Sequence, residues 1–212
     1  AHADGICHMY LHAAADPAMA ARLVVDAKCS YPAACNAVET LLWDPEATAA
    51  LDSCVSALSS QGVELRGCRE TRKRHPQMNA ATGADWDAEY GALILSIRQV
   101  AGMSEALAHI ATHGSRHTDV IVTQDPVAAG RFLAEVDAAC VFHNASNRFS
   151  DGYRFGLGAE VGISTEKLHA RGPVGVEGLL TYRWLLYGHG QATTEYGPGR
   201  RHYIHKDLPV DG

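Results

Sequence analysis

The sequence predicts an α/β fold in which a mostly parallel sheet is flanked by helices. Two observations support this prediction. Short apolar runs suited to strands alternate with amphipathic segments suited to helices between residues 6 and 143, and that alternation is typical of parallel sheets. Asp-Pro pairs also stand at three of the expected helix starts, where the carboxylate can cap the helix and proline has no N–H to leave unpaired.

Four helices are expected in this part of the chain. They begin at Asp16-Pro17, Asp44-Pro45, Ser104 and Asp125-Pro126. In the first, Met19, Leu23 and Val24 recur at helical spacing. Glycine ends helices well, so the second helix should stop near Gly62 and the third near Gly114.

Six apolar runs beside these helices are strand candidates. They are residues 6–11, 38–43, 63–66, 92–100, 119–123 and 139–143. Because helical segments separate many of these runs, we expect mostly parallel pairing.

The chain changes character after residue 143. Glycines recur through residues 144–178 and predict a long ordered loop, which in a compact domain is usually functional. Residues 179–187 return as an apolar strand, and the tail from Gly188 is polar and glycine-rich. We find no internal repeat.

Composition excludes several classes of protein. The chain has 212 residues, of which 47% are hydrophobic and 20% charged, as is usual for globular proteins. Its net charge of -6 argues against a nucleic-acid partner, and we interpret the basic run 69–75 as a solvated loop. No run reaches the roughly 18 apolar residues that cross a bilayer, so no membrane partner is expected. The first residues carry neither Met nor a signal layout, which suggests part of a longer protein.

The cysteines and histidines do not indicate a metal site. The six cysteines include no C-x-x-C pair, which favours a reduced intracellular compartment, the cytoplasm, or alternatively a plastid or mitochondrion. His109 and His113 are four residues apart, but they end a predicted helix, where a cationic side chain complements the dipole.

Cys35 is the strongest candidate for a reactive residue. It stands among small residues in a loop between a predicted helix and strand, so its sulfur should be approachable and backbone N–H groups could face an oxyanion. A thiolate is a strong nucleophile toward an acyl carbon. The alternative is a buried structural cysteine, and the other five cysteines keep that interpretation.

Polar residues at predicted strand ends are further candidates. Glu89, just before a strand, could accept hydrogen bonds from ribose hydroxyls or be a solvated acid. Asn144, Ser146 and Arg148 follow the strand 139–143, and Arg148 could hold a carboxylate or phosphate. The alternative is that these side chains bond the local backbone. No G-x-G-x-x-G follows a strand, so most of any dinucleotide site should lie outside this chain.

Several segments resemble the γ-glutamyl phosphate reductases. The segment YPAACNAVETLL at 31–42 looks like the active-cysteine segment of that family, and 114–119, 144–164 and 167–173 resemble it too. The opening and closing segments, 2–8 and 205–209, resemble the bifunctional pyrroline-5-carboxylate synthases in their plant or algal form. The resemblance spans nearly the whole chain except 68–84 and 191–202.

The resemblance implies an aldehyde-dehydrogenase-like fold. Residues 1–178 would form the catalytic domain and 179–212 the oligomerisation strand and tail, which pairs with a neighbouring subunit of a homo-oligomer. The nucleotide-binding domain would be absent from this chain, and the chain alone should not turn over.

The resemblance also implies the chemistry and the site. Cys35 would attack glutamyl 5-phosphate and expel phosphate, and NADPH would reduce the thioester to glutamate 5-semialdehyde on the route to proline. Glu89 would contact the nicotinamide ribose. The residues that would help hold the substrate are Asn36, Asn144, Ser146 and Arg148.

Two rival interpretations stay open. Residues 179–187 could make the chain a non-catalytic assembly module. Cys35 could also serve a hydrolase together with His117, His143 or His169, which requires an imidazole within hydrogen-bond reach of the sulfur. One departure from the family pattern, Asn147 in place of a typical threonine, affects the detail of the substrate loop.

Overall fold

A computed structural model describes residues 5–187, 189 and 192–202. The chain divides into a larger unit that ends at Leu180 and a smaller one that begins at Thr181. The opening segment 2–8 lies only partly within the described residues, and the closing segment 205–209 lies outside them.

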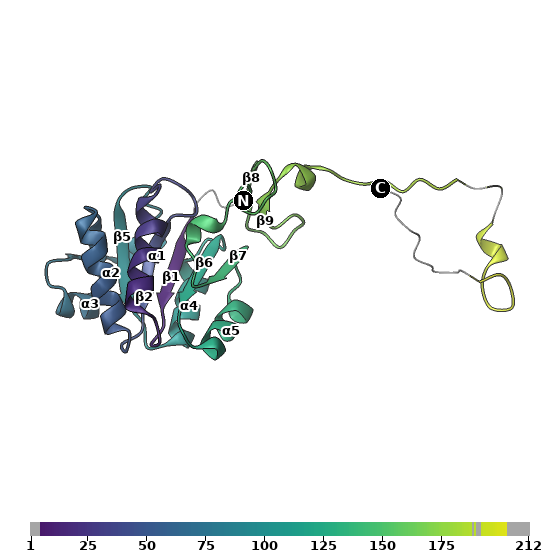
Figure 1. Cartoon of the computed structure of the whole chain (residues 1–212). Coiled ribbons are helices and arrows are strands. Elements are labelled where there is room, and N and C mark those ends of the chain that lie inside the picture. The colour runs from purple at the N-terminus through teal and green to yellow at the C-terminus, as the bar shows by residue number, and fades with distance from the viewer. Residues whose placement is uncertain (1–4, 188, 190–191, 203–212) are drawn as a thin grey trace. The chain divides into compact units, whose positions relative to one another are not determined.

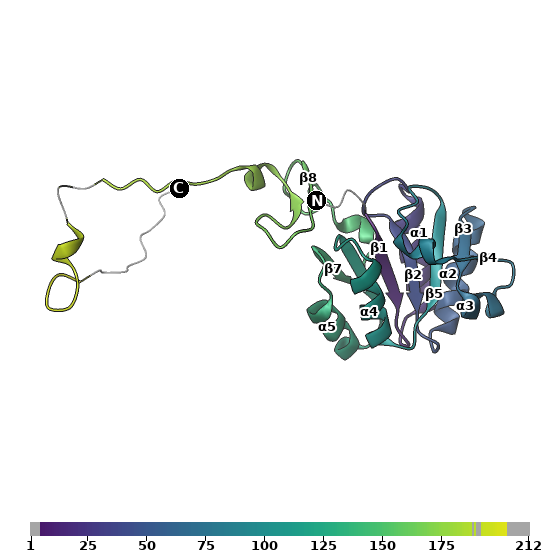
Figure 2. The same cartoon turned by 180° about the vertical axis from the view of Figure 1, so that it is seen from behind.

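A seven-stranded sheet forms the centre of the larger unit, and all of its neighbouring strands pair in parallel. Its order is β4-β3-β5-β2-β1-β6-β7; β1, β2, β5, β6 and β7 are labelled in Figure 1, and β3 and β4 in Figure 2. The strands are β1 Cys7–Leu11, β2 Val38–Trp43, β3 Glu64–Gly67, β4 Asn79–Ala80, β5 Ile94–Gln99, β6 Thr118–Val122 and β7 Cys140–His143. The predicted α/β class and the six predicted strands are confirmed, and the short edge strand β4 is an addition.

Two layers of helices cover the sheet. The helices are α1 Pro17–Cys29, α2 Thr48–Ser60, α3 Arg69–Arg74, α4 Met103–His113 and α5 Pro126–Glu135. Side chains alternate between the sheet's two faces along each strand. Leu41 of β2 therefore joins the core beneath α1 and α2, while its neighbour Leu42 joins the core beneath α4 and α5. Figures 1 and 2 show these two sides of the sheet.

Two of the predicted helix starts are confirmed by their caps. Asp16 accepts a hydrogen bond from the Met19 N–H at 2.7 Å, and Asp125 accepts from the Val127 N–H at 2.8 Å. In both helices proline occupies one of the first positions, as the Asp-Pro pattern predicts.

The other two helix starts were wrong. Asp44 accepts from the N–H of Glu46 at 3.0 Å, so it closes a turn, and α2 begins only at Thr48. Ser104 lies inside α4, which follows Gly102. Gly102 has a φ of 103°, a conformation that a residue with a Cβ rarely adopts.

The basic run 69–75 is also a correction, because most of it forms helix α3 instead of a solvated loop. Thr71 is fully buried, and its hydroxyl accepts from the Trp43 indole N–H at 2.9 Å. One buried side chain therefore anchors an otherwise charged helix to the sheet.

The glycine-rich segment has more structure than the predicted loop. It contains a short 3₁₀ turn at Asn147–Phe149 and an antiparallel pair, β8 Gly162–Ser164 and β9 Gly172–Val174. A further 3₁₀ turn follows at Val176–Leu179.

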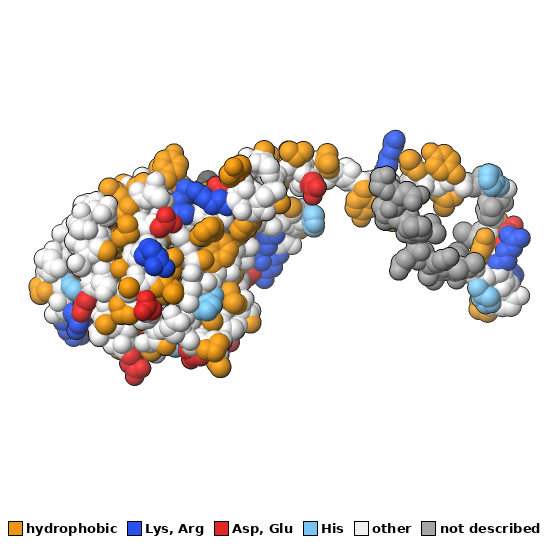
Figure 3. All heavy atoms as spheres, viewed as in Figure 1, with side chains coloured by type: hydrophobic (Ala, Val, Ile, Leu, Met, Phe, Trp, Pro, Cys, Tyr) orange, Lys and Arg blue, Asp and Glu red, His pale blue; other side chains and the backbone are white. Residues whose placement is uncertain are grey.

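Residues 180–187 adopt no regular secondary structure in this single chain. Their large apolar side chains are exposed (orange in Figure 3), and they include Leu180, Tyr182, Trp184, Leu185, Leu186 and Tyr187. A strand needs a partner for its backbone, so the predicted pairing with another subunit stays a prediction. No helix in the described part of the chain is long and apolar enough to span a membrane.

Candidate active site at the amino-terminal edge of the sheet

Cys35 lies in a tight loop between α1 and β2. Two successive backbone hydrogen bonds fold this loop, from the Ala34 N–H to Tyr31 O at 3.2 Å and from the Ala37 N–H to Ala34 O at 2.8 Å. Of the six cysteines, all of which are described and unpaired in disulfides, Cys35 alone is exposed. The small neighbours therefore leave its sulfur approachable, as the sequence predicts.

The start of the first strand packs directly on this loop. A Cβ placed on Gly5 would come within 2.1 Å of the Cys35 carbonyl oxygen, so the contact requires glycine at that position. The thiol of Cys7 donates to the same oxygen at 3.4 Å. Gly5 and Cys7 thereby hold the backbone of Cys35 in place at its carbonyl group, while its side chain stays accessible.

An imidazole lies within reach of the sulfur. Nε2 of His117 is 3.2 Å from Sγ of Cys35, and the His117 side chain is buried. Cys35 precedes β2 and His117 precedes β6, and only β1 separates those strands. Parallel strands place their starts at one edge of the sheet, which brings the two side chains together.

A chain of hydrogen bonds continues behind His117. Its Nδ1 lies 2.7 Å from Oγ1 of Thr118, and the Thr118 hydroxyl donates to Oγ of Ser150 at 2.7 Å. The Ser150 hydroxyl donates in turn to the carbonyl of Asn147 at 2.9 Å. All of these side chains are buried.

The environment holds both reacting groups in their neutral forms. Burial raises the pKa of the Cys35 thiol, and the charges of Glu160 and Glu89 add to that effect. The backbone N–H of Cys35 and the charge of Arg148 partly offset it. Burial lowers the pKa of His117 to about 4, although Asp119 acts in the opposite direction. At neutral pH the pair is therefore a thiol facing an uncharged imidazole.

Two of the other predicted site residues lie near Cys35. Glu89 is exposed, and its charge acts on the thiol. Arg148 is partly buried, its guanidinium lies 5.9 Å from the centre of the Tyr31 ring, and its Nε donates to the Ser30 hydroxyl at 3.3 Å. The charges of both residues therefore act on the Cys35 thiol, in opposite directions.

Three predicted substrate contacts have side chains engaged elsewhere. The amide of Asn36 is buried and donates to Ser150 O at 2.8 Å. Oγ of Ser146 accepts from the Arg148 N–H. Asn144 accepts from the Thr123 N–H at 2.9 Å and donates to its carbonyl at 2.8 Å. Thr123 follows β6 and Asn144 follows β7, so Asn144 lies at the carboxyl-terminal edge of the sheet, opposite Cys35.

Asn147, the departure from the family pattern, joins two strands. Its amide is buried and donates to the carbonyls of His8 in β1 and Thr118 in β6, both at 3.2 Å. One side chain with two donor hydrogens can satisfy both carbonyls, and a threonine hydroxyl has only one hydrogen to give.

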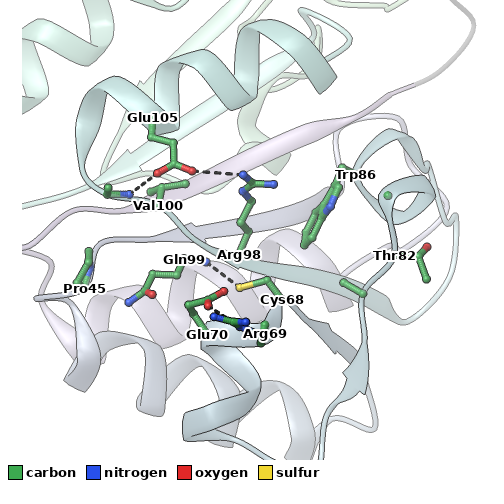
Figure 4. Close-up of a pocket in the computed structure, with 13 residues that line it drawn as sticks. Pro45, Cys68, Arg69, Glu70, Thr82, Trp86, Arg98, Gln99, Val100 and Glu105 are labelled. Carbon is green, nitrogen blue, oxygen red and sulfur yellow. Dashed lines mark hydrogen bonds and ion pairs between the residues drawn. The ribbon is translucent and has the colours of Figure 1, made fainter.

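A hollow of about 500 Å³ lies at the carboxyl-terminal edge of the sheet, and Figure 4 shows residues that line it. The guanidinium of Arg98 lies 5.6 Å from the centre of the Trp86 ring and pairs with Glu105 at 3.3 Å. Because each arginine that lines this hollow is paired with a glutamate, the lining has no clear preference for ligand charge. It also lies at the edge opposite Cys35. Among the described residues, no group of three or more His, Cys, Asp or Glu is arranged to hold a metal ion.

Comparison with known proteins finds relatives of one kind. No protein-family model matches the chain. A curated γ-glutamyl phosphate reductase from Synechococcus sp. (strain JA-3-3Ab) is 58% identical over 208 residues, which is 97% of this chain and 46% of that protein. The chain is homologous to the γ-glutamyl phosphate reductases.

Solved structures agree with this homology. The crystal structure of γ-glutamyl phosphate reductase from Thermotoga maritima is 42% identical, with a TM-score of 0.86 over 89% of this chain and 46% of that one. An acetylating aldehyde dehydrogenase from Geobacillus thermoglucosidasius shares the fold, with a TM-score of 0.52 at 19% identity over 69% of this chain and 41% of that one. The predicted aldehyde-dehydrogenase-like fold is confirmed. The chain spans about half the length of the curated reductases it matches.

Sequence reasoning missed the chain behind His117 and the effect of Glu160. A signal for His117 was present, because it directly precedes a predicted strand, as the Cys35 loop does. Nothing in the sequence marked Thr118 or Ser150, because their role depends on which strands become neighbours.

Proposed function

We propose that this chain is the cysteine-bearing half of a γ-glutamyl phosphate reductase, an oxidoreductase of proline biosynthesis. The reaction converts L-glutamyl 5-phosphate to L-glutamate 5-semialdehyde with NADPH and releases phosphate. The homology supports the reaction, and one structural observation carries the site: an exposed thiol 3.2 Å from a buried imidazole.

The proposed first step is acyl transfer to sulfur. Sγ of Cys35 forms a bond to the γ-carbonyl carbon, the bond between that carbon and the phosphate oxygen breaks, and the thiol proton leaves the sulfur. The product is a glutamyl thioester on Cys35 and inorganic phosphate. Phosphate is a good leaving group, so the step needs a nucleophile and a base more than it needs an acid.

Arg148 is the best placed residue for the substrate's α-carboxylate. Its guanidinium is positioned by Ser30 and Tyr31, and its charge reaches Cys35. A guanidinium binds a carboxylate through two parallel hydrogen bonds. Asn36, Asn144 and Ser146 would act indirectly, by shaping the loops, because their side chains bond to neighbouring backbone.

Glu89 fits a contact with the cofactor. Its carboxylate is exposed before β5 and close enough to Cys35 to act on the thiol, and carboxylates commonly accept hydrogen bonds from ribose hydroxyls in dinucleotide sites. When bound, NADPH would supply the hydride that reduces the thioester. The described strand-to-helix turns contain no glycine-rich fingerprint for the cofactor's phosphates, so Glu89 is the one cofactor contact proposed among the described residues.

A cysteine hydrolase is the second candidate, and the contact between Cys35 and His117 favours it. The required imidazole is present at 3.2 Å, whereas Nε2 of His143 donates to the Thr123 carbonyl at 2.9 Å, at the opposite edge of the sheet. Both functions form the thioester on Cys35, and they differ in whether water hydrolyses it or a hydride reduces it. A hydrolase yields glutamate, and a reductase yields the semialdehyde.

The assembly role is compatible with either chemistry. Residues 180–187 expose several large apolar side chains, and burial of such a strip against a second copy would remove it from water. We propose that the full enzyme is a homo-oligomer that uses this segment.

Acylation of the full chain tests the proposal. The chain would be incubated with glutamyl 5-phosphate generated in place from glutamate, ATP and a glutamate 5-kinase, then measured by intact mass spectrometry. We expect one glutamyl group on Cys35 and none in a Cys35→Ala variant. Absence of acylation, or acylation at another cysteine, would refute the assignment.

A second measurement separates reductase from hydrolase. NADPH and a nucleotide-binding half would be supplied with the acylated chain, and the products would be identified. Semialdehyde formation with loss of NADPH absorbance supports the reductase. Glutamate as the main product, at a rate that NADPH leaves unchanged, supports the hydrolase.

A further inference from the structure

We propose that His117 is the general base that deprotonates Cys35 during acyl transfer, and that Thr118 and Ser150 position it by fixing its tautomer. This inference rests on the proposed function and deepens it. The sulfur is the reacting atom, and Nε2 of His117 touches it at 3.2 Å, within the range for direct proton transfer.

The tautomer follows from the hydrogen-bond chain, starting at its far end. The Asn147 carbonyl can only accept, so the hydrogen between it and Ser150 comes from the serine hydroxyl. Oγ of Ser150 must then accept from Thr118, whose single hydroxyl hydrogen is used in that bond. Oγ1 of Thr118 is left to accept from Nδ1 of His117.

Nδ1 therefore carries the ring hydrogen of neutral His117, and Nε2 presents a lone pair to the sulfur. An imidazole in the other tautomer would direct a hydrogen at Sγ and could not take its proton. The chain behind the ring acts as an orienting group of the kind that nucleophile and base pairs require.

The charges around the pair favour proton transfer during attack over an ion pair formed beforehand. Burial, Glu160 and Glu89 raise the pKa of Cys35, against smaller opposing effects of its own N–H and Arg148. Burial keeps His117 neutral, with Asp119 as the opposing charge. A neutral thiol is a poor nucleophile, so a base that acts as the carbon–sulfur bond forms has a large effect.

The proton balance closes over both steps. In acyl transfer the proton moves from Sγ to Nε2, and from there to the expelled phosphate. After reduction the aldehyde departs and leaves a thiolate, which takes one proton from water by way of Nε2. The pair returns to a neutral thiol and neutral imidazole, and one proton is consumed for each semialdehyde formed.

The test measures the rate of Cys35 acylation by acetyl phosphate, in single-turnover mode across pH, on the full chain. With His117 as the base, the rate should be nearly independent of pH between 6 and 8, because Nε2 is already unprotonated there. A rate that rises tenfold for each pH unit would mean that free thiolate attacks. That result in the parent chain alone would contradict the inference.

Variants sharpen this test. His117→Gln should lower the rate at pH 7 by about 10² to 10³, the usual contribution of a general base, and should make the rate rise tenfold per pH unit, because only free thiolate then attacks. Thr118→Val should lower the rate by about tenfold because the tautomer is no longer fixed, and Thr118→Ser should recover it. His109→Gln, at another buried histidine, is the matched control and should react like the parent chain.

The outcomes distinguish the two proposals. If the parent chain is not acylated on Cys35 by acetyl phosphate or glutamyl 5-phosphate, the proposed function fails and the inference fails with it. If the parent chain is acylated and a folded His117→Gln variant reacts at the same rate and with the same pH profile, the inference alone fails.

Discussion

Cys35 combines accessibility with a thiol that resists ionisation. Its side chain is the only exposed one among the six described cysteines, yet burial of the sulfur and two nearby carboxylates raise its pKa. A thiol in that state reacts slowly with general electrophiles, because the thiolate is the reactive form. Selectivity for an acyl phosphate would then come from the partner that removes the proton.

The nearby charges give a prediction with opposite signs at two positions. Glu89→Gln removes a negative charge that raises the pKa of Cys35, and Arg148→Gln removes a positive charge that lowers it. We expect the midpoint of Cys35 alkylation by iodoacetamide to shift to lower pH in the first variant and to higher pH in the second. Shifts in the same direction would contradict the charge assignment.

The site residues divide by what a sequence can show. Small neighbours and a break between helix and strand were enough to single out Cys35. These sequence features could not show that the Asn144 and Ser146 side chains hydrogen-bond to nearby backbone groups, because those bonds depend on loop geometry. The position of Arg148 relative to the sulfur likewise depends on the path that residues 144–150 take after β7.

At the scale of elements, a buried ion pair joins α1 to β2 on either side of the Cys35 loop. Nζ of Lys28 lies 2.6 Å from Oε2 of Glu39, and both side chains are almost fully buried. Burial lowers the pKa of Lys28 and raises the pKa of Glu39 to about 7. Loss of hydration therefore outweighs the attraction between the two charges, and the pair ties the two elements together at a net cost.

A double-mutant cycle tests this interpretation. Lys28→Met or Glu39→Leu alone leaves one buried ionisable group without its partner and should lower the free energy of unfolding by about 3–5 kcal/mol. The double variant leaves none and should lie within about 1 kcal/mol of the parent chain. Urea unfolding at pH 7.5 measures all four proteins. Additive losses in the double variant would show that packing, and not charge, dominates this contact.

The Asp-Pro signal predicted a helix start correctly at two of its three positions. Asp16 and Asp125 cap helices because Pro follows each and the next residues continue the helix. Asp44-Pro45 carries the same signal, but Asp44 instead accepts from Glu46 in a turn. Helix α3 was missed because its anchor, Thr71, meets Trp43 from a strand 28 residues away, and a local pattern does not record such a contact.

At the scale of the whole molecule, strand order decides where the chemistry lies. The order β2-β1-β6 places the residues before β2 and β6 at one edge, although Cys35 and His117 are 82 residues apart in sequence. The same parallel arrangement sends Asn144 and the hollow of Figure 4 to the other edge. Alternation of strands and helices predicts a parallel sheet, but it does not fix the order of the strands. The sequence therefore left His117 as one of three candidate partners of Cys35, with His143 and His169.

The pH dependence of global stability provides a last prediction, and its sign follows from three buried groups. Burial lowers the pKa of His109 to about 2 and that of His117 to about 4, so between pH 6.5 and 4.5 each takes up a proton mainly on unfolding. Glu39 has its pKa raised to about 7, so between pH 7 and 4.5 it is protonated only in the folded chain. As the pH falls, the two histidines therefore lower the free energy of unfolding, and Glu39 raises it.

The contributions of the two histidines outweigh the opposite contribution of Glu39 and leave a net loss of stability as the pH falls. From pH 6.5 down to 4.5 the free energy of unfolding should fall by about 1.4 kcal/mol per pH unit, the value for one proton. The exposed carboxylates whose pKa is lowered by ion pairs, such as Asp52 and Glu64, begin to contribute only below that window. His109→Gln removes one of the two histidines, so its stability should be nearly independent of pH over the same range. Urea unfolding of both proteins at pH 6.5, 5.5 and 4.5 measures the two slopes, and equal slopes would mean that His109 is protonated in the folded chain.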